Sequence, residues 1–207
     1  MAQAPYTLDM LLLLALLAAS PNGRAAPELL GGLGPLRPQV GAWVEYLVRS
    51  RGEPDVRARV AVVPPLITGR AWIEVATVGA QTLPFAVRVL LHAATGRMER
   101  AAVYALGQAP IELPVDDAQG ANALVQRSRR VGSRTVIVPA GTFATTEVLV
   151  NDGTATTRVF RSDRVPLWGV VRAEGSGRTI ELLRYGHGGA RSVFPVVQGN
   201  GSESANE

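Results

Sequence analysis

Apolar and polar residues alternate along most of the chain from Gly41 onward. Between residues 42 and 49, Ala, Val and Tyr fall on one face, and the charged residues Glu45 and Arg49 fall on the other. Residues 56–62 repeat this pattern. A period of two is typical of strands that bury one face. Short turns with Gly or Pro separate the alternating stretches, which favours antiparallel hairpins over parallel strands joined by helices.

We therefore predict a mainly β fold, with about ten antiparallel strands in a curved sheet or half-barrel and one or two short helices. The strands are expected over residues 42–49, 56–62, 70–78, 85–91, 98–106, 134–138, 142–150, 154–162, 167–174 and 178–185. One helix is expected from Asp117 to about Arg129, because Asp116 and Asp117 can cap its start and arginines suit the negative end of its dipole. Asp152-Gly153 predicts a tight hairpin turn.

The N-terminal region contains an apolar run from Met10 to Ala19. A helix that crosses a bilayer needs about 20 apolar residues, whereas the hydrophobic segment of a secretory signal has about 7–15. The run therefore predicts export to the periplasm or the medium, with no integral membrane span in the mature chain. Asp9 precedes the run and no basic residue does, so the true start codon and the cleavage site stay open.

Composition shifts along the chain divide it into four parts. We expect a signal segment over residues 1–26, a Pro- and Gly-rich linker over 27–39, a single β-rich domain over 40–197 and a disordered tail over 198–207. The chain is long enough for that domain to build a substantial core of its own.

Charge and cysteine content exclude some kinds of partner and some kinds of site. The net charge is +4, and all 21 basic residues are arginine. Arginine without lysine is typical of a GC-rich genome, and an exported protein is a poor match to nucleic acid, so we expect no nucleic-acid partner. The chain has no cysteine, which excludes disulfides, thiolate metal sites and a cysteine nucleophile.

No catalytic or metal motif stands out. His187-Gly188-Gly189 is similar to an esterase oxyanion loop, but the chain contains no Gly-x-Ser-x-Gly elbow to accompany it. His92 and His187 are the only histidines, and neither has a second ligand at a useful spacing. We therefore predict a protein that is not an enzyme, with no cofactor, no metal site and no catalytic residue.

Tryptophans and arginines remain as candidate binding residues. By period two, Trp43 and Trp72 share a face with nearby glutamates, opposite the cleanly apolar face, and Trp168 is expected on a mixed face as well. These rings either line a partly apolar cavity or pack beneath a helix or near a sheet edge. The arginines around the expected helix end either meet anionic head groups or an acidic partner, or lie in solvent. The candidate ligand-binding residues are Trp43, Trp72, Trp168, Arg127, Arg129 and Arg130. Arg158, Arg161 and Arg164 form a second group of arginines.

Three C-terminal motifs carry a resemblance. Val138 to Phe143 reads Val-Pro-Ala-Gly-Thr-Phe, Arg164 to Val171 includes Pro-Leu-Trp-Gly, and Leu182 to Gly186 reads Leu-Leu-Arg-Tyr-Gly. This stretch resembles uncharacterised bacterial periplasmic β-domains, which in turn resemble the half-barrels of lipoprotein-carrier proteins of the Lol type. The resemblance implies a concave antiparallel sheet that holds acyl chains, and it assigns a role to no individual residue.

These observations predict an exported, non-catalytic β-domain that binds an apolar or amphipathic envelope ligand, such as a lipid or the acyl chain of a lipoprotein. The alternative is a structural or accessory component of a cell-envelope assembly, which would use its sheet edges and the tryptophan-bearing face as an interface. The candidate partners are accordingly a lipid, a lipoprotein or another envelope protein.

Overall fold

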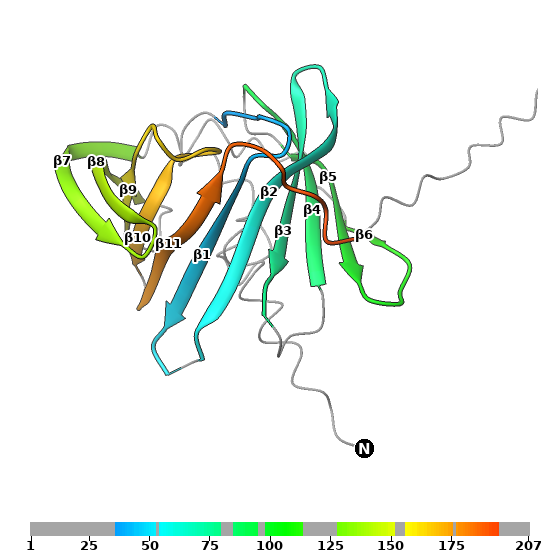
Figure 1. The fold of residues 1–207 in the computed structure, drawn as a ribbon, viewed down its shortest axis with the longest axis horizontal. Coiled ribbons are helices and arrows are strands. Elements are labelled where there is room, and N and C mark those ends of the chain that lie inside the picture. The colour runs from blue at the N-terminus through cyan, green and yellow to red at the C-terminus, as the bar shows by residue number, and fades with distance from the viewer. Residues whose placement is uncertain are drawn as a thin grey trace, which may run out of the picture.

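The computed structural model describes residues 36–52, 54–79, 85–94, 98–113, 128–151, 156–175 and 177–194. Over these residues the chain forms one curved sheet of eleven strands (Figure 1). The strands are β1 (Trp43–Ser50), β2 (Val56–Ile67), β3 (Arg70–Thr77), β4 (Phe85–His92), β5 (Met98–Ala105), β6 (Ile111–Leu113), β7 (Ser128–Val138), β8 (Gly141–Asn151), β9 (Thr156–Arg161), β10 (Val170–Gly175) and β11 (Arg178–Gly186). The predicted fold class of antiparallel strands in a curved sheet is confirmed.

Two meanders make up the sheet, whose strand order is β6-β5-β4-β3-β2-β1-β11-β10-β9-β8-β7. Within β1–β6 and within β7–β11, strands that follow one another in the sequence lie side by side, and β1 joins the halves by pairing with both β2 and β11. Short connections suit this topology, because antiparallel neighbours need only a hairpin turn. Among the described strands, β6 and β7 form the two edges of the sheet.

The core lies on one face of the sheet, which we call the inner face. Val44, Val60 and Val75 lie opposite one another across β1, β2 and β3, and Ile73 and Val89 continue the same face. All five side chains are buried. The periodic valines and alanines of the sequence thus form this face, as the alternation predicts.

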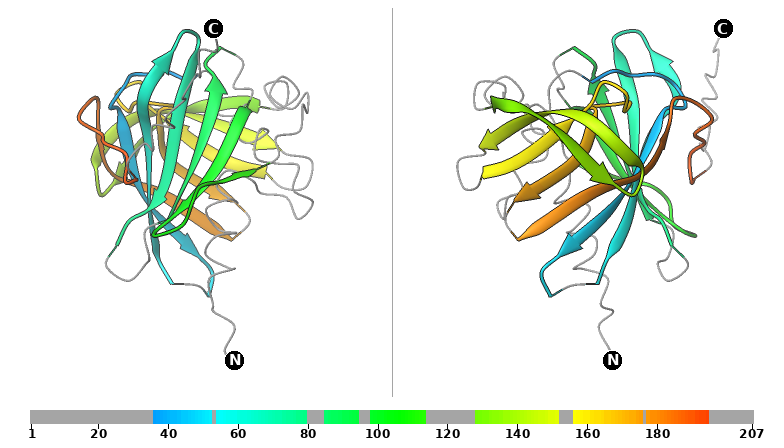
Figure 2. Two further views of the ribbon diagram at one scale, coloured as in Figure 1. Left: turned by 90° about the vertical axis from the view of Figure 1, so that its right-hand side faces the viewer. Right: turned by 60° about the vertical axis from the view of Figure 1, so that its left-hand side comes forward.

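The opposite or outer face carries the C-terminal segment, residues 187–194, which we call the strap. It crosses β1 to β5 on the outside of the curve (Figure 2). Backbone hydrogen bonds fasten its beginning, since Ala190 N donates to Gly41 O at 2.9 Å.

Two local predictions are wrong. Leu167 to Gly169, expected to begin a strand, form a turn in which Leu167 and Gly169 have φ values of 61° and 75°. The predicted helix lies outside the described residues up to Arg127, but Ser128 and Arg129 belong to β7. Pairing with β8 determines this strand, and such tertiary pairing overrides local propensity. Consequently β7 also begins six residues earlier than the expected residue 134.

The expected signal segment and tail, residues 1–26 and 198–207, lie outside the described residues. The end of the expected linker is described. There Leu36 is buried in the core cluster, and Arg37 forms a β-bridge with Leu167.

Candidate functional site

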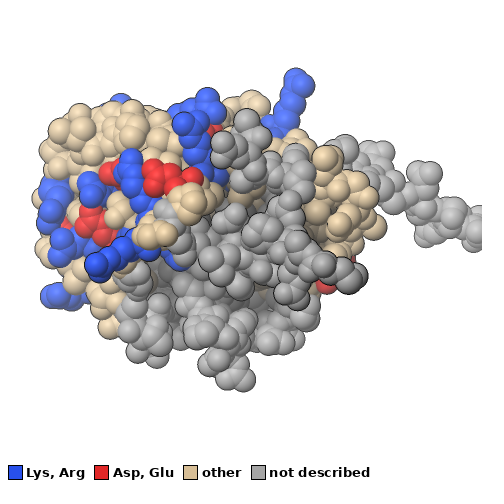
Figure 3. Space-filling view, turned by 90° about the horizontal axis from the view of Figure 1, so that it is seen from below, with Lys and Arg blue, Asp and Glu red and all other residues tan. Residues whose placement is uncertain are grey.

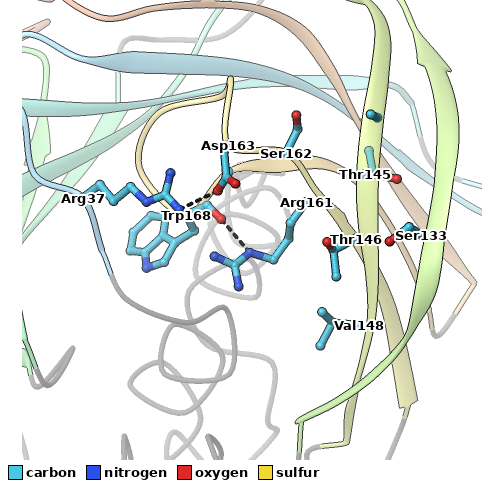
Figure 4. A pocket seen from close by; sticks show the side chains of 11 residues that line it. Arg37, Ser133, Thr145, Thr146, Val148, Arg161, Ser162, Asp163 and Trp168 are labelled. Atoms are coloured by element: carbon cyan, nitrogen blue, oxygen red, sulfur yellow. Dashed lines mark hydrogen bonds and ion pairs between the residues drawn. The ribbon is translucent and has the colours of Figure 1, made fainter.

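A pocket of about 470 Å³ opens on the inner face of the C-terminal half of the sheet (Figure 4). Thr146 and Val148 of β8 lie opposite Arg161 and Val159 of β9, which places them on the inner face. We call this cavity the Arg161 pocket. Its lining residues are Arg37, Ser133, Ala144, Thr145, Thr146, Val148, Arg161, Ser162, Asp163, Trp168 and Gly169. The volume is in the range of known small-molecule sites, about 300–1,000 Å³.

Arg161 is the central cation of the pocket. Its Nε donates a hydrogen bond to the backbone oxygen of Trp168 at 2.8 Å. Burial, and next the positive charge of Arg37, lower the pKa of Arg161, while Asp163 acts in the opposite direction. The guanidinium nevertheless stays protonated, because arginine titrates far above neutral pH. Arg161 forms no ion pair with any carboxylate of the described residues.

Arg37 and Asp163 form an ion pair at the rim. The Nη2 atom of Arg37 lies 2.6 Å from Oδ1 of Asp163, and both side chains are largely exposed. Arg37 holds the pKa of the Asp163 carboxyl below its ordinary value, first through this hydrogen bond and then through its charge. The two arginines and one aspartate leave the pocket with a net charge of about +1 at neutral pH.

The loop between β9 and β10 fixes Trp168 in the pocket. Ser162 N donates to Gly169 O at 2.8 Å, which closes the loop. Gly169 has a φ of 75°, and a Cβ there would lie 2.8 Å from Ser162 O. Only glycine fits this position without strain. The ring of Trp168 is 8% exposed and packs in the core cluster, so its contact with the pocket is held rigidly.

Four hydroxyl-bearing residues, Ser133, Thr145, Thr146 and Ser162, share the lining with the apolar side chains of Ala144, Val148 and Trp168. The Thr145 hydroxyl is already engaged, since it donates to Arg134 O at 2.8 Å. The pocket is therefore mixed in character, with cations and hydroxyl groups beside an apolar wall.

The structure separates the predicted binding residues. Trp168 lines the Arg161 pocket, and Arg130 lies beside it, with Nη2 donating to the Ser133 hydroxyl at 3.4 Å. Arg129 is exposed on β7 opposite Leu149. Arg127 lies outside the described residues.

Trp43 and Trp72 lie on the outer face, away from the pocket. They pack against Ala61, Val63 and Ala190, so the strap covers part of this face. Across the strands, Trp43 and Glu74 also share this face, because each lies opposite Ala61. The two tryptophans and Trp168 do not line a common cavity.

A buried ionic network holds the strap on the outer face. Nε of Arg88 donates to Oε2 of Glu74 at 2.9 Å, and both side chains are about 95% or more buried. The Ser192 hydroxyl bonds to the same carboxylate, and Val193 N donates to its Oε1 at 2.9 Å. Arg88 also donates to Phe194 O at 2.5 Å.

Sequence reasoning missed Arg37, Asp163 and the hydroxyl residues of the pocket. Arg37 falls in the expected linker, and no motif links it to Asp163, which lies 126 positions away. Arg161 belongs to the second arginine group of the sequence, and no feature of the sequence distinguishes it there from Arg158 and Arg164.

Two features are absent from the described part of the chain. No helix there is long and apolar enough to cross a membrane. No group of three or more His, Cys, Asp or Glu residues in these ranges is arranged to hold a metal ion.

No protein-family model matches the chain. No curated protein is similar to it in sequence.

Solved structures with a related arrangement of strands include MucB in complex with MucA(peri), at 10% identity and a TM-score of 0.47 over 83% of this chain and 57% of that one. A Bacteroides fragilis protein described as exported, with a YmcC-like fold, has 12% identity and a TM-score of 0.43 over 73% of this chain and 98% of that one. A lipoprotein from Parabacteroides distasonis has 10% identity and a TM-score of 0.40 over 72% and 97%.

The chain thus spans a little over half of the MucB chain. Because the identities and TM-scores are this low, the binding of MucA is a property of MucB and is not transferred to this chain.

Proposed function

We propose that this chain is an exported, non-catalytic β-domain that binds an anionic amphiphile of the cell envelope in the Arg161 pocket. The observation that carries the proposal is the state of Arg161. Its half-buried guanidinium faces a cavity and pairs with no described carboxylate. A desolvated cation without a counter-ion is costly, and an anionic ligand relieves that cost.

The lining also favours an amphiphile over a purely apolar chain. An alkyl chain alone would leave the hydroxyl groups of Ser133, Thr146 and Ser162 without partners from the ligand. A carboxylate or phosphate group beside Arg161 would accept hydrogen bonds from them, while an attached apolar part would lie against Trp168 and Val148. The proposal thus specifies the predicted ligand further: its head group would bind in the Arg161 pocket.

Direct binding measurements test this proposal. Isothermal titration would compare dodecyl phosphate below its micellar concentration with inorganic phosphate and with neutral dodecyl maltoside. We expect dodecyl phosphate to bind and the neutral detergent not to bind. The Arg161→Gln variant should bind about tenfold more weakly or worse, because a charge-assisted hydrogen bond contributes about 1.5–3 kcal/mol.

The Arg51→Gln variant is the matched control. Arg51 is exposed in the turn after β1 and is not among the lining residues, so the variant has the same net charge change with an intact pocket. Equal loss in both variants would mean that overall charge governs binding and would contradict the proposal. Inorganic phosphate binding as tightly as dodecyl phosphate would reduce the ligand to a free anion.

Export is proposed on the run from Met10 to Ala19. N-terminal sequencing of protein recovered from its own cells would give the mature start. A start after the run is expected, and an intact Met1 would contradict export by cleavage.

A further inference from the structure

Strand β7 forms one edge of the sheet. It has eleven residues, and all of its described strand pairs are with β8. Strands in globular proteins most often have about 5–6 residues, and long open edges are usually shortened or covered. Among the described residues, no strand lies on the free side of β7.

The hairpin defines which backbone groups of β7 are free. Val138 lies opposite Gly141 across a two-residue turn, and such a flanking pair is hydrogen-bonded. Alternate residues then bond to β8, and those between them direct their N–H and C=O outward. The outward residues are Ser133, Thr135 and Ile137. The Ile137 side chain is 73% exposed, which is high for a large apolar residue in a strand.

The charges of β7 are all positive. Arg129, Arg130 and Arg134 lie along it, and the strand has no acidic residue. Arg129 and Arg130 are exposed, and Arg134 pairs with Glu147 at 2.6 Å while keeping half of its side chain exposed. Figure 3 shows basic and acidic groups gathered on the side of the molecule built by the C-terminal strands.

These charges disfavour pairing of β7 with a second copy of itself. Two copies of β7 side by side would bring the three arginines of each strand together, with no acidic residue on either strand to pair with them. Like charges directly opposite each other destabilise a strand pair. A partner strand with acidic residues opposite these arginines would instead form cross-strand ion pairs.

We propose that the free edge of β7 binds an extended acidic segment of a partner protein, which adds to the sheet as a twelfth strand. Main-chain hydrogen bonds from Ser133, Thr135 and Ile137 would align the segment, as in known strand addition. Its acidic residues would pair with Arg129 and Arg134, which share the outer face because they lie opposite Leu149 and Thr145, and its apolar residues would cover Ile137 on the inner face. This interaction goes beyond the proposed ligand site and does not rest on it.

Fluorescence anisotropy with a labelled nine-residue peptide of alternating Glu and Val tests the proposal on the full chain. A Lys and Val peptide controls for charge. An acidic peptide with N-methylated backbone amides controls for main-chain hydrogen bonding. We expect the unmodified acidic peptide alone to bind. Binding by the lysine peptide, equal binding by the methylated peptide, or no binding by any peptide would each overturn the proposal.

Two variants locate the site. Arg129→Gln with Arg130→Gln should weaken binding about fivefold, since the exposed ion pair at Arg129 contributes up to about 1 kcal/mol and the loss of Arg130 lowers the positive charge of the edge further. Arg51→Gln with Arg57→Gln removes two exposed arginines at the β1–β2 hairpin and should leave binding unchanged. Equal losses in the two double variants would contradict a site at β7.

Thr135→Pro removes an outward N–H, a change that an edge strand tolerates. This variant should keep the circular dichroism spectrum and lose peptide binding, and a folded variant that still binds would overturn the proposal. If it fails to fold, the methylated peptide gives the same information on the wild type. Arginine-dependent binding to phosphatidylglycerol vesicles without peptide binding would assign the strand to a membrane surface and reject the partner segment.

Discussion

Replacement of Arg88 by methionine is expected to lower the free energy of unfolding by about 3–5 kcal/mol, because it leaves a buried charge without its partner. Arg88 lies on β4, and its side chain is 5% exposed, while that of Glu74 is 3% exposed. Methionine keeps most of the apolar stem of arginine but has no donor. The carboxylate of Glu74 would keep its hydrogen bonds from Ser192 and Val193 and lose its counter-ion.

The same substitution removes two other contacts of the guanidinium. Phe194 O loses one of its two donors and keeps the Ser192 hydroxyl, and the guanidinium no longer stacks on the ring of Tyr104, whose centroid lies 4.2 Å away. A cation–π contact contributes about 0.5–2 kcal/mol. A domain is stable by only about 5–15 kcal/mol in total, so the predicted loss is a large share.

Urea unfolding at pH 7, followed by tryptophan fluorescence, measures this loss. The double variant Glu74→Leu with Arg88→Met should lose much less than Arg88→Met alone, because it leaves no buried charge. Arg57→Met is the control on an exposed site and should stay within about 0.5 kcal/mol of the wild type. In hydrogen exchange, the Val193 amide should lose protection in the double variant, since its acceptor is gone.

Two results would refute this reasoning. A loss below about 1 kcal/mol for Arg88→Met would mean that Glu74 is not held as a buried charge. An equal loss in the single and double variants would attribute the effect to packing, with no contribution from the ion pair.

Four further predictions concern the core and the pocket. Tyr46→Phe should cost about 1 kcal/mol in urea unfolding, because the hydroxyl donates to a buried backbone oxygen at 3.1 Å; no loss would refute that role. Gly169→Ala should cost about 1–3 kcal/mol and weaken dodecyl phosphate binding, since it strains a positive φ; unchanged binding would show that the loop does not shape the pocket. Asp163→Asn should tighten dodecyl phosphate binding about two- to fivefold at pH 7 by removing a negative charge, and weaker binding would contradict the electrostatic account. Because Arg37 lowers the pKa of Asp163, the carboxylate stays charged until the pH falls through this lowered pKa. Protonation then removes the negative charge at the rim of the pocket. Lowering the pH should therefore raise the affinity for an alkyl sulfonate, whose own charge does not change with pH, in the wild type but not in Asp163→Asn.

Alternation predicted most of the sheet because the side-chain period of a strand is a local property. It correctly placed Trp43 and Trp72 on the face opposite the buried valines. Alternation failed where pairing with an adjacent strand, and not the order of apolar and polar residues, makes a segment a strand. The start of β7 is polar on both faces, and its pairing with β8 is what makes it a strand. It also failed at Leu167, whose positive φ belongs to a loop closed by hydrogen bonds.

The candidate site was predictable only in part. The sequence indicates Trp168 as a candidate and offers Arg161 only as one of several arginines. Arg37 could not be found, because its partner Asp163 is 126 positions away and is brought near by the bridge to Leu167. The sequence also could not reveal that Trp43 and Trp72 share a cluster with Ala190 of the strap.

The sequence by itself determined the fold class and the two faces of the first strands, because both follow from the identity of near neighbours in the chain. Only the tertiary structure decided which charges are paired. Glu74 and Arg88 neutralise each other beneath the strap, whereas Arg161 faces a cavity without a described counter-ion. Pairing depends on distance in space and on exclusion of water, and neither is encoded by the spacing of residues along a strand.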